Sequence, residues 1–402
     1  MRPAGTGAYA DFVMRRTGLL TAAAALAATV ALTGCGGPAS TSTSGSAADV
    51  VSVNTGSCGG HWHLAHPGWH TFQIRNSGDS GTEVDLTNPA NGAVYAELEQ
   101  MGPGTTTPMS LNVGSGRYAF VCQFVDTNPI AGPTITVPGH AKGTAPTLPV
   151  TFNELIPVAK KYQAVTEAAL KVLAAKTRTL NAAVQGGDLA AARRDWLTAH
   201  LQYETLGAAY GAFANYDNEI NGRADPVGVS SPKWTGFYRL EYGLWHGQSA
   251  RELRPVAETL DKDVSALLAW WPSQQISLID LGRRAHEVIE NALEFQLTGH
   301  DDYGSGTTLA TTVANITASK VLLSLLQPLL TPRYPGLPAV YTWLGQLRAL
   351  LEKEHLPSGS WVPVSRLPAR ARQEIDAACG QALQELAPIA SITEPRNTYR
   401  AF

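Results

Sequence analysis

Two pairs of polar side chains are spaced so that each pair lies on one helix face. Tyr238 and Glu241 are three residues apart in "KWTGFYRLEYGLW", and His200 and Glu204 are four apart in "HLQYE". Residues at these spacings are neighbours on a helix surface. Phenolate, carboxylate and imidazole together suit a hard ion such as ferric iron better than copper(I). The alternative is structural: Tyr238 packs its ring and hydrogen-bonds its hydroxyl, and Glu204 pairs with an arginine.

More oxygen-bearing side chains separate these two pairs. Asp217, Glu219 and Asn221 follow His200 and Glu204 in the sequence. Pro232 marks the predicted start of the helix that carries Tyr238. We expect these elements to converge on an oxygen-rich pocket inside a helical bundle, which is a usual place for a metal.

Four of the ten histidines lie within ten residues of "SCGGHWHLAHPGWH", namely His61, His63, His66 and His70. On an extended strand His61 and His63 point to the same side. Such a pair is suited to a metal that prefers imidazole nitrogen, such as copper or zinc. The alternative is a polar loop or edge strand with no ligand.

Cys58 and Cys122 bracket the same region and leave two interpretations open. They form a disulfide, or they are thiolate ligands of a metal site helped by Glu83. A blue-copper site needs a His and usually a Met soon after the cysteine. The run "CQFVDTNPIAGPTITV", from Cys122 onward, supplies neither, so we do not expect an electron-transfer copper centre.

The pattern of apolar and polar residues changes along the chain. Residues 51–139 contain short strand-like runs separated by Gly, Pro, Asn and Ser, which predicts an antiparallel β-sandwich. Residues 140–149 are a Gly/Pro-rich linker. Residues 150–392 carry long apolar patterns at helical spacing, which predicts a bundle of seven or eight helices, and 393–402 form a tail. The predicted fold class is therefore multidomain, an all-β sandwich followed by an all-α bundle.

Two helix boundaries are predicted in detail. Gly186 and Gly187 should end the first helix of the bundle, and Asp188 should cap the next one. The apolar pattern extends that second helix to Phe213.

The first residues indicate export. Arg15 and Arg16 precede a short apolar run that ends in Leu-Thr-Gly-Cys, which predicts a signal peptide over residues 1–34. Cys35 would then carry a lipid, and residues 35–50 would be a flexible tether. The alternative is a cleaved, soluble secretory protein. A formal net charge of −3 gives no case for nucleic-acid binding.

The runs "YETLGAAYGAFANYDNEINGRAD" and "SPKWTGFYRLEYGLW", with "LTGHDDYGSGTTLATTVANITASKVLLSLLQPLL" and "GPGTTTPMSLNVGSGRYAFVC", resemble the EfeO-type iron-uptake lipoproteins. The resemblance covers nearly all of the chain after the signal peptide. It implies a cupredoxin-like domain over 51–139 and an imelysin-like helical domain over 150–392.

The resemblance also implies site residues, with departures. The helical motif of the family is His-x-x-Glu, and here Glu241 matches the Glu whereas Tyr238 replaces the His. Glu204 matches an upstream Glu, and Asn221 replaces an upstream Asp. His200 is an additional candidate that could substitute for the missing imidazole.

In the sandwich the proposed ligands of the family correspond to Cys58, Cys122 and Glu83, and Phe120 replaces a Met. Losing that Met while gaining His61 and His63 suggests that the emphasis of metal binding has moved to the sandwich.

The implied function is an extracytoplasmic, lipid-anchored component of an EfeUOB-like iron-uptake system. It would capture iron, as Fe3+ or Fe2+, with copper or zinc as further ions, at the cell membrane on the periplasmic side. The implied partners are a ferrous-iron permease and a DyP-type haem peroxidase. The alternatives are a metal-free ligand-binding or adhesion lipoprotein and an imelysin-like peptidase. Peptidase activity is not expected, because Tyr238 replaces the motif His and no His-Glu-x-x-His occurs.

Overall fold

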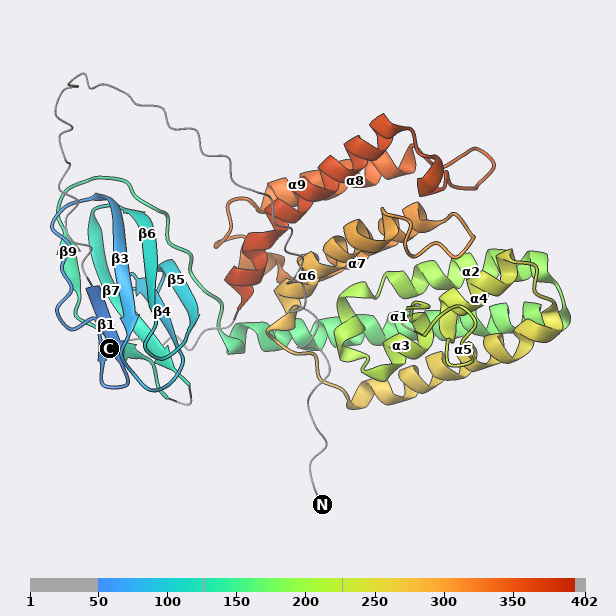
Figure 1. Cartoon of the computed structure of the whole chain (residues 1–402), viewed down its shortest axis with the longest axis horizontal. Coiled ribbons are helices and arrows are strands. Elements are labelled where there is room, and N and C mark those ends of the chain that lie inside the picture. Colours follow the sequence, from blue (N-terminus) through green and yellow to red (C-terminus); the bar gives the residue numbers. More distant parts are fainter. Residues whose placement is uncertain (1–49, 126, 226, 395–402) are drawn as a thin grey trace, which may run out of the picture. The chain divides into compact units, whose positions relative to one another are not determined.

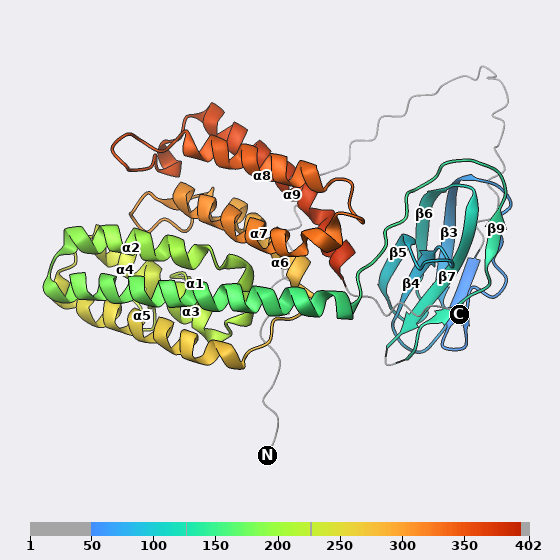
Figure 2. The ribbon, with the colours of Figure 1, turned by 180° about the vertical axis from the view of Figure 1, so that it is seen from behind.

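The structure is a computed structural model that describes residues 50–394 except 126 and 226. The predicted signal peptide, Cys35 and the tail after residue 394 lie outside the described residues. By contacts the chain divides into Met1–Ser46 and Ala47–Phe402. The second unit contains strands followed by helices, which confirms the predicted fold class (Figures 1 and 2). We describe the strand region and the helical region separately.

The strand region is a sandwich of two sheets. The strands of the first sheet lie in the order β2-β1-β3-β6, with bounds β1 Val50–Asn54, β2 Ser57–Cys58, β3 Gly68–Asn76 and β6 Thr106–Val113. The second sheet has the order β5-β4-β7-β8, with β9 on β7, and bounds β4 Thr82–Thr87, β5 Val94–Met101, β7 Gly116–Phe124, β8 Ile130–Ala131 and β9 Ile135–Val137. The expectation of a purely antiparallel sandwich is wrong at one pair, because β1 runs parallel to β3.

Alternation along the strands builds the core between the sheets. On β7, Tyr118, Phe120, Cys122 and Phe124 occur at every second position and are all buried. Because successive strand residues point to opposite faces, this spacing sends one row of side chains inward. Phe72 of β3 joins the same core.

The helical region has nine α-helices among the residues that the structure describes. Their bounds are α1 Phe152–Gly186, α2 Leu189–Glu204, α3 Asn215–Asn221, α4 Gly236–Trp245, α5 Ala250–Trp270, α6 Asp280–Asn291, α7 Thr308–Leu330, α8 Leu337–Glu352 and α9 Ala369–Thr393. Short turns of other kinds connect some of them: η1 Gly207–Ala212, η2 Trp271–Ser273, η3 Ala292–Gln296 and η4 Val364–Arg366.

Local sequence signals set the first helices. Thr151 and Glu154 form a capping box at the start of α1, and Gly187 ends that helix in the left-handed conformation with φ 83°. Asp188 caps α2 by accepting a hydrogen bond of 2.9 Å from the main-chain nitrogen of Ala191. The predicted end of the first helix and the predicted cap at Asp188 are confirmed. The predicted extension of α2 to Phe213 is wrong, because α2 ends at Glu204 and a 3-10 turn follows.

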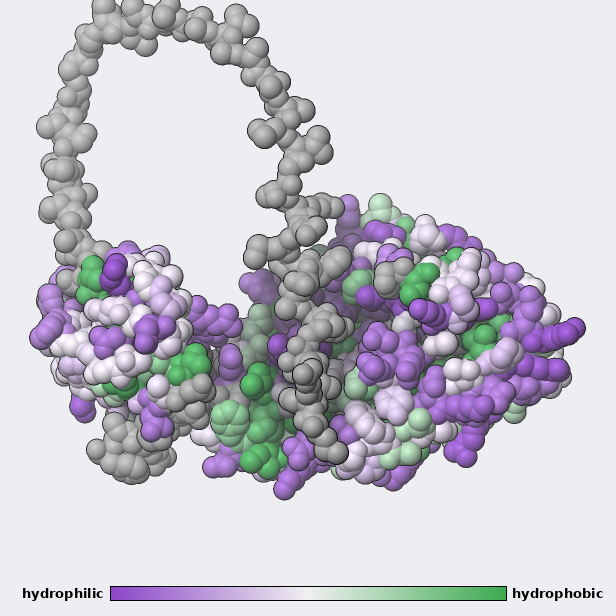
Figure 3. All heavy atoms as spheres, turned by 60° about the horizontal axis from the view of Figure 1, so that its bottom comes forward, coloured by the Kyte–Doolittle hydropathy of each residue, from purple (hydrophilic) through white to green (hydrophobic). Residues whose placement is uncertain are grey.

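Helix α7 runs through the core of the helical region. In length and hydropathy it is the one helix among the described residues that could span a membrane, but 67% of its most apolar window is buried inside the protein. A helix that is apolar on all sides is typical of a core position. On the face shown in Figure 3, hydrophobic side chains occur in groups among hydrophilic ones.

Candidate metal centre

Helix α4 carries Tyr238 and Glu241, and a glycine fixes where it begins. Gly236 has φ +84°, and a Cβ atom at this position would lie 2.3 Å from the main-chain oxygen of Ile220. Only glycine adopts this conformation readily and permits so close an approach to the end of α3. The predicted helix start at Pro232 is wrong, because Pro232 lies in a turn before α4.

Glu204, at the end of α2, lies among three polar side chains. The amide nitrogen of Asn221 donates to Glu204 Oε1 at 2.9 Å. The Asn315 amide, oriented with its nitrogen toward Glu204, donates to Oε2 at 2.9 Å. His200 Nε2 lies 3.0 Å from Oε1, but the two atoms are not aligned for a hydrogen bond. Glu204 and His200 are 2% and 1% exposed, so this carboxylate is held out of water.

Only one of the two carboxylate oxygens of Glu241 accepts hydrogen bonds. Its Oε1 accepts hydrogen bonds from the main-chain nitrogens of Tyr303 at 3.2 Å and Ser305 at 3.0 Å. Its Oε2 is buried without a hydrogen-bond partner among the described residues. Burial raises the pKa of Glu241 to about 7, against the opposing effects of the Ser305 hydrogen bonds and the charge of His200. The Glu241 carboxyl group therefore titrates near neutral pH, and its Oε2 is buried.

Asp301, in the loop before α7, contacts the hydroxyl of Tyr238. Its Oδ2 accepts hydrogen bonds from the Tyr238 hydroxyl at 3.3 Å and from Gln296 Nε2 at 2.8 Å. Its Oδ1 is 3.8 Å from Arg223 Nη1, which is too long for a hydrogen bond. Burial raises the pKa of Asp301 to about 6, although Arg223 opposes this. The carboxylate of Asp301 thus keeps one oxygen without a close donor.

Tyr238 is a protonated phenol in this environment. Burial, followed by the negative charges of Asp301, Glu204 and Glu241, raises the pKa of Tyr238 well above its ordinary value. The same charges would stabilise a cation placed among them. Tyr238 can therefore coordinate as phenolate only if a bound cation replaces its proton.

The region contains an unusual concentration of buried polar atoms that lack hydrogen-bond partners among the described residues. They are Glu241 Oε2, Asp301 Oδ1, Asn221 Oδ1, Gln296 Oε1 and both ring nitrogens of His200. A buried acceptor without a donor costs about 1–3 kcal/mol, and native proteins keep few of them. Most of these atoms are oxygens, the ligand atoms that hard cations prefer.

The possible metal ligands of this region do not yet surround one point as the ligands of a bound ion would. No three His, Asp or Glu side chains of the described helical region place ligand atoms within 4.8 Å of one another. The amide oxygens of Asn221 and Gln296 and the phenol of Tyr238 would have to complete a coordination shell, or the carboxylates would have to move inward. The structure thus brings together the predicted residues His200, Glu204, Asn221, Tyr238 and Glu241, and their role as ligands stays a prediction. Of the other two predicted residues, Glu219 is exposed, and Asp217 accepts a hydrogen bond from the Tyr203 hydroxyl at 2.6 Å.

Three residues of this region escaped the sequence analysis: Gln296, Asp301 and Asn315. Asp301 lies in the turn-rich run "GHDDYGSG" between two helices, which was a usable signal because polar loops inside bundles often carry function. Gln296 ends η3, a π-helical turn, and such turns often mark functional sites. Nothing in the sequence distinguished Asn315 within the apolar α7.

In the sandwich, Cys58 and Cys122 form a disulfide. Of the two interpretations that the sequence left open, this is the structural one, and in this oxidised state neither sulfur is a thiolate ligand. Phe120, which replaces the Met of the family, is fully buried and packs edge-on against Trp62 with ring centroids 4.7 Å apart.

The sheet register also separates Glu83 from the cysteines. Val84 of β4 pairs directly with Cys122 of β7, so these two side chains share the inner face. Glu83 is the neighbour of Val84 and points to the opposite face. A site made of both cysteines and Glu83 is therefore not assembled, and this expectation is wrong for the structure described.

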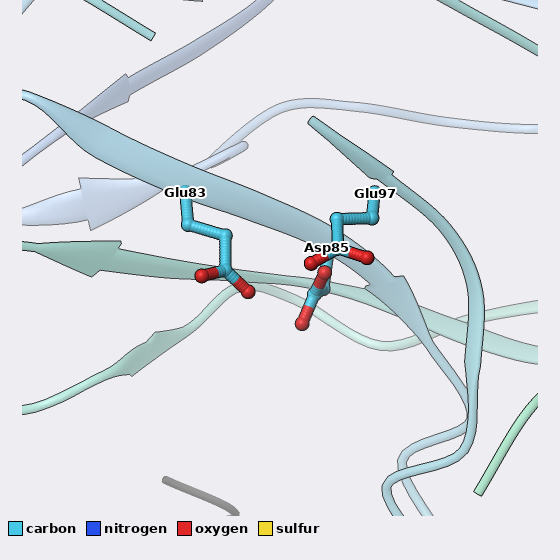
Figure 4. A group of neighbouring side chains, drawn as sticks. All are labelled: Glu83, Asp85 and Glu97. Carbon is cyan, nitrogen blue, oxygen red and sulfur yellow. The ribbon is translucent and has the colours of Figure 1, made fainter. Parts of the chain in front are cut away.

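Glu83 instead belongs to a carboxylate cluster with Asp85 and Glu97 (Figure 4). Ligand oxygens of the three side chains lie within 4.8 Å of one another. Asp85 and Glu97 are directly paired across β4 and β5. Like charges in directly opposite positions tend to destabilise a sheet, and Asp85 is buried while Glu83 and Glu97 are half-buried.

Three of the clustered histidines, His61, His63 and His66, lie between β2 and β3, and His70 lies on β3. His61 and His63 are exposed while the residues after each, Trp62 and Leu64, are buried. The segment is not a strand, contrary to the expectation, but it keeps the alternation that turns His61 and His63 outward.

We compared the chain with known proteins. The sequence pattern of the imelysin family, a peptidase family termed M75, matches residues 158–387, more than half of the chain. The chain therefore belongs to the imelysin family. Among curated proteins it is similar to the iron uptake system component EfeO of Yersinia pestis, with 28% identity over 299 residues, 71% of this chain and 76% of that protein. It is 27% identical to EfeO of Escherichia coli strain K12 over 305 residues, 73% of this chain and 78% of that protein. The predicted EfeO-type resemblance is confirmed.

Proposed function

We propose that this protein is an extracytoplasmic, lipid-anchored component of an iron-uptake system, and that it captures iron in the helical region for a membrane permease. The observation that carries the proposal is the group of buried acceptor atoms around Tyr238 that lack donors. The similarity to EfeO components supports iron as the ion. The predicted lipid at Cys35 would keep the protein at the cell membrane.

The chemistry of the side chains favours ferric iron. Glu241 and Asp301 each present one oxygen without a close donor, and both carboxylates are harder donors than a thiolate or thioether. Tyr238 contributes a phenol whose proton a trivalent cation would displace most easily. A hard, highly charged ion satisfies all three groups at once, whereas copper(I) satisfies none of them well.

The proposed function does not include peptidase activity. A zinc peptidase needs protein ligands that leave one metal position open for water, and a general base beside it. Here the motif histidine is Tyr238, whose hydroxyl is directed to Asp301 at 3.3 Å. We therefore propose a binding role for the chain, with no hydrolytic step.

Titration of the mature protein with Fe3+, supplied as its nitrilotriacetate complex, tests the proposal. The wild type should bind iron in a stoichiometric ratio and develop a visible phenolate-to-iron absorption band. The Glu204→Gln/Glu241→Gln variant should lose binding. The Tyr238→Phe variant should lose the band.

The matched control is Glu258→Gln/Glu290→Gln, which changes two exposed glutamates of the helical region and should bind like the wild type. Unchanged binding in the Glu204→Gln/Glu241→Gln variant would rule out the helical site. Absence of binding in the wild type would favour the metal-free ligand-binding or adhesion alternative.

A further inference from the structure

His66, just before β3, and His70, on β3, form a close pair of imidazole rings. The rings of His66 and His70 have centroids 5.0 Å apart with planes inclined by 37°. His66 is exposed, and His70 is half-buried.

Main-chain carbonyl groups orient both rings. His66 Nδ1 lies 3.3 Å from the Pro67 oxygen, and His70 Nε2 lies 2.9 Å from the His66 oxygen. A carbonyl oxygen can only accept, so each of these nitrogens carries the hydrogen. The lone pair is then on the other nitrogen, Nε2 of His66 and Nδ1 of His70. A backbone carbonyl that fixes the tautomer in this way is the usual partner of a metal-binding histidine.

The segment that holds the pair is firmly attached to the sandwich. Trp62 is buried, and its indole nitrogen donates to the Pro133 oxygen at 3.0 Å. Its ring packs edge-on against Phe72, with centroids 6.0 Å apart. The His70 ring is in turn stacked against Phe72, with centroids 6.1 Å apart. The His70 ring is therefore positioned by a core residue, and Trp62 anchors the segment that precedes His66, which reduces the ordering that a ligand would require.

We propose that His66 and His70 form a surface site for a divalent cation of the imidazole-binding type, with copper(II) bound most tightly and zinc(II) next. Nitrogen–metal bonds of about 2 Å place two imidazole rings that share one ion roughly 5 Å apart, which agrees with the ring spacing here. The order of affinity follows from the general preference of nitrogen ligands among divalent metals. This site is separate from the proposed iron site and differs from it in ligand type.

Equilibrium titration of the full mature protein with Cu2+ tests this proposal. The His66→Gln/His70→Gln variant should bind Cu2+ at least about 100-fold more weakly, because it removes the ligands themselves, whereas loss of outer partners alone typically costs 10–100-fold. Pulsed electron paramagnetic resonance of the wild-type Cu2+ complex should show coupling to two imidazoles. Zn2+ should displace Cu2+ only in excess.

Three controls make the result specific. His140→Gln, an exposed histidine of the linker, should leave Cu2+ affinity unchanged. His61→Gln/His63→Gln should lower it less than the His66 and His70 change does. Glu204→Gln/Glu241→Gln should retain Cu2+ binding even where iron binding is lost, which separates this proposal from the proposed function. Equal Cu2+ affinity in wild type and His66→Gln/His70→Gln would overturn the assignment.

Discussion

The helical region and the sandwich both concentrate groups that can bind metals, but they treat charge in opposite ways. Around Tyr238 the carboxylates are buried and lack some of their hydrogen-bond donors. In the sandwich the cysteines are joined in the core, while the acidic side chains of Glu83, Asp85 and Glu97 gather on the outer face of one sheet. Asp85 is 8% exposed, and Glu83 and Glu97 are half-buried, so this cluster is only partly open to water. Buried polar groups must be satisfied by protein or ligand. The helical region points to an ion more strongly because Glu241 Oε2 and Asp301 Oδ1 are buried without a hydrogen-bond partner among the described residues.

The largest effect should come from the disulfide. Cys58→Ala/Cys122→Ala should lower the unfolding free energy of the sandwich by about 2–5 kcal/mol, because it removes a cross-link between residues 64 apart in sequence. Iron binding by the helical region should persist. Thermal unfolding followed by near-ultraviolet circular dichroism measures the first, and iron titration the second. Cys379→Ala is the control, since this buried free cysteine belongs to the helical region. Parallel loss of iron binding would show that the two regions share one site.

A smaller effect is expected from Glu241 and depends on pH. Its folded-state pKa of about 7 lies above the ordinary 4.5, so the folded protein holds the proton where the unfolded chain has lost it. The stability contributed by this group therefore falls as pH rises from about 4.5 to 7. At pH 7.5 without metal, Glu241→Gln should be more stable than wild type by roughly 1–3 kcal/mol, and the gain should vanish near pH 4.5.

Urea unfolding at both pH values, in the presence of a chelator, measures that difference. Glu258→Gln, on the exposed side of α5, should show no such pH dependence. A gain that is the same at both pH values would contradict the assignment of the raised pKa to Glu241.

Restoring the family motif should sharpen the helical site. Tyr238→His replaces a phenol that holds its proton tightly with a neutral nitrogen donor, so iron affinity should rise about tenfold, or about 1.4 kcal/mol. The phenolate absorption band should disappear at the same time. Iron titration checks both, with Tyr242→His on the same helix as control. Weaker binding in Tyr238→His would mean that the phenol is the better ligand here.

The smallest effect concerns the outer carboxylates. Glu97→Gln removes one of two directly opposed charges and should stabilise the sandwich by about 0.2–1 kcal/mol. Glu99→Gln, an exposed neighbour on the same strand, should change stability less. Thermal unfolding at low salt measures both. Destabilisation by Glu97→Gln would indicate that the cluster already has a cationic partner.

The sequence allowed the order of strands and helices, the end of the first helix at Gly187 and the cap at Asp188 to be predicted, because these depend on local spacing. It did not allow the face on which Glu83 lies to be predicted, since that depends on strand register. The role of Asp301 was missed for a related reason. A loop residue reaches a site through tertiary contacts, which leave no periodic signal.

The π-helical turn at Ala292–Gln296 has a consequence for comparing related sequences. A π turn accommodates one residue more than an α turn, and one residue corresponds to about 100° of rotation around a helix. Whether Gln296 and Asp301 reach Tyr238 is thus decided by chain length at this turn as well as by residue type. An alignment that places no gap here could pair Asp301 with the wrong position in a relative whose helix lacks the turn.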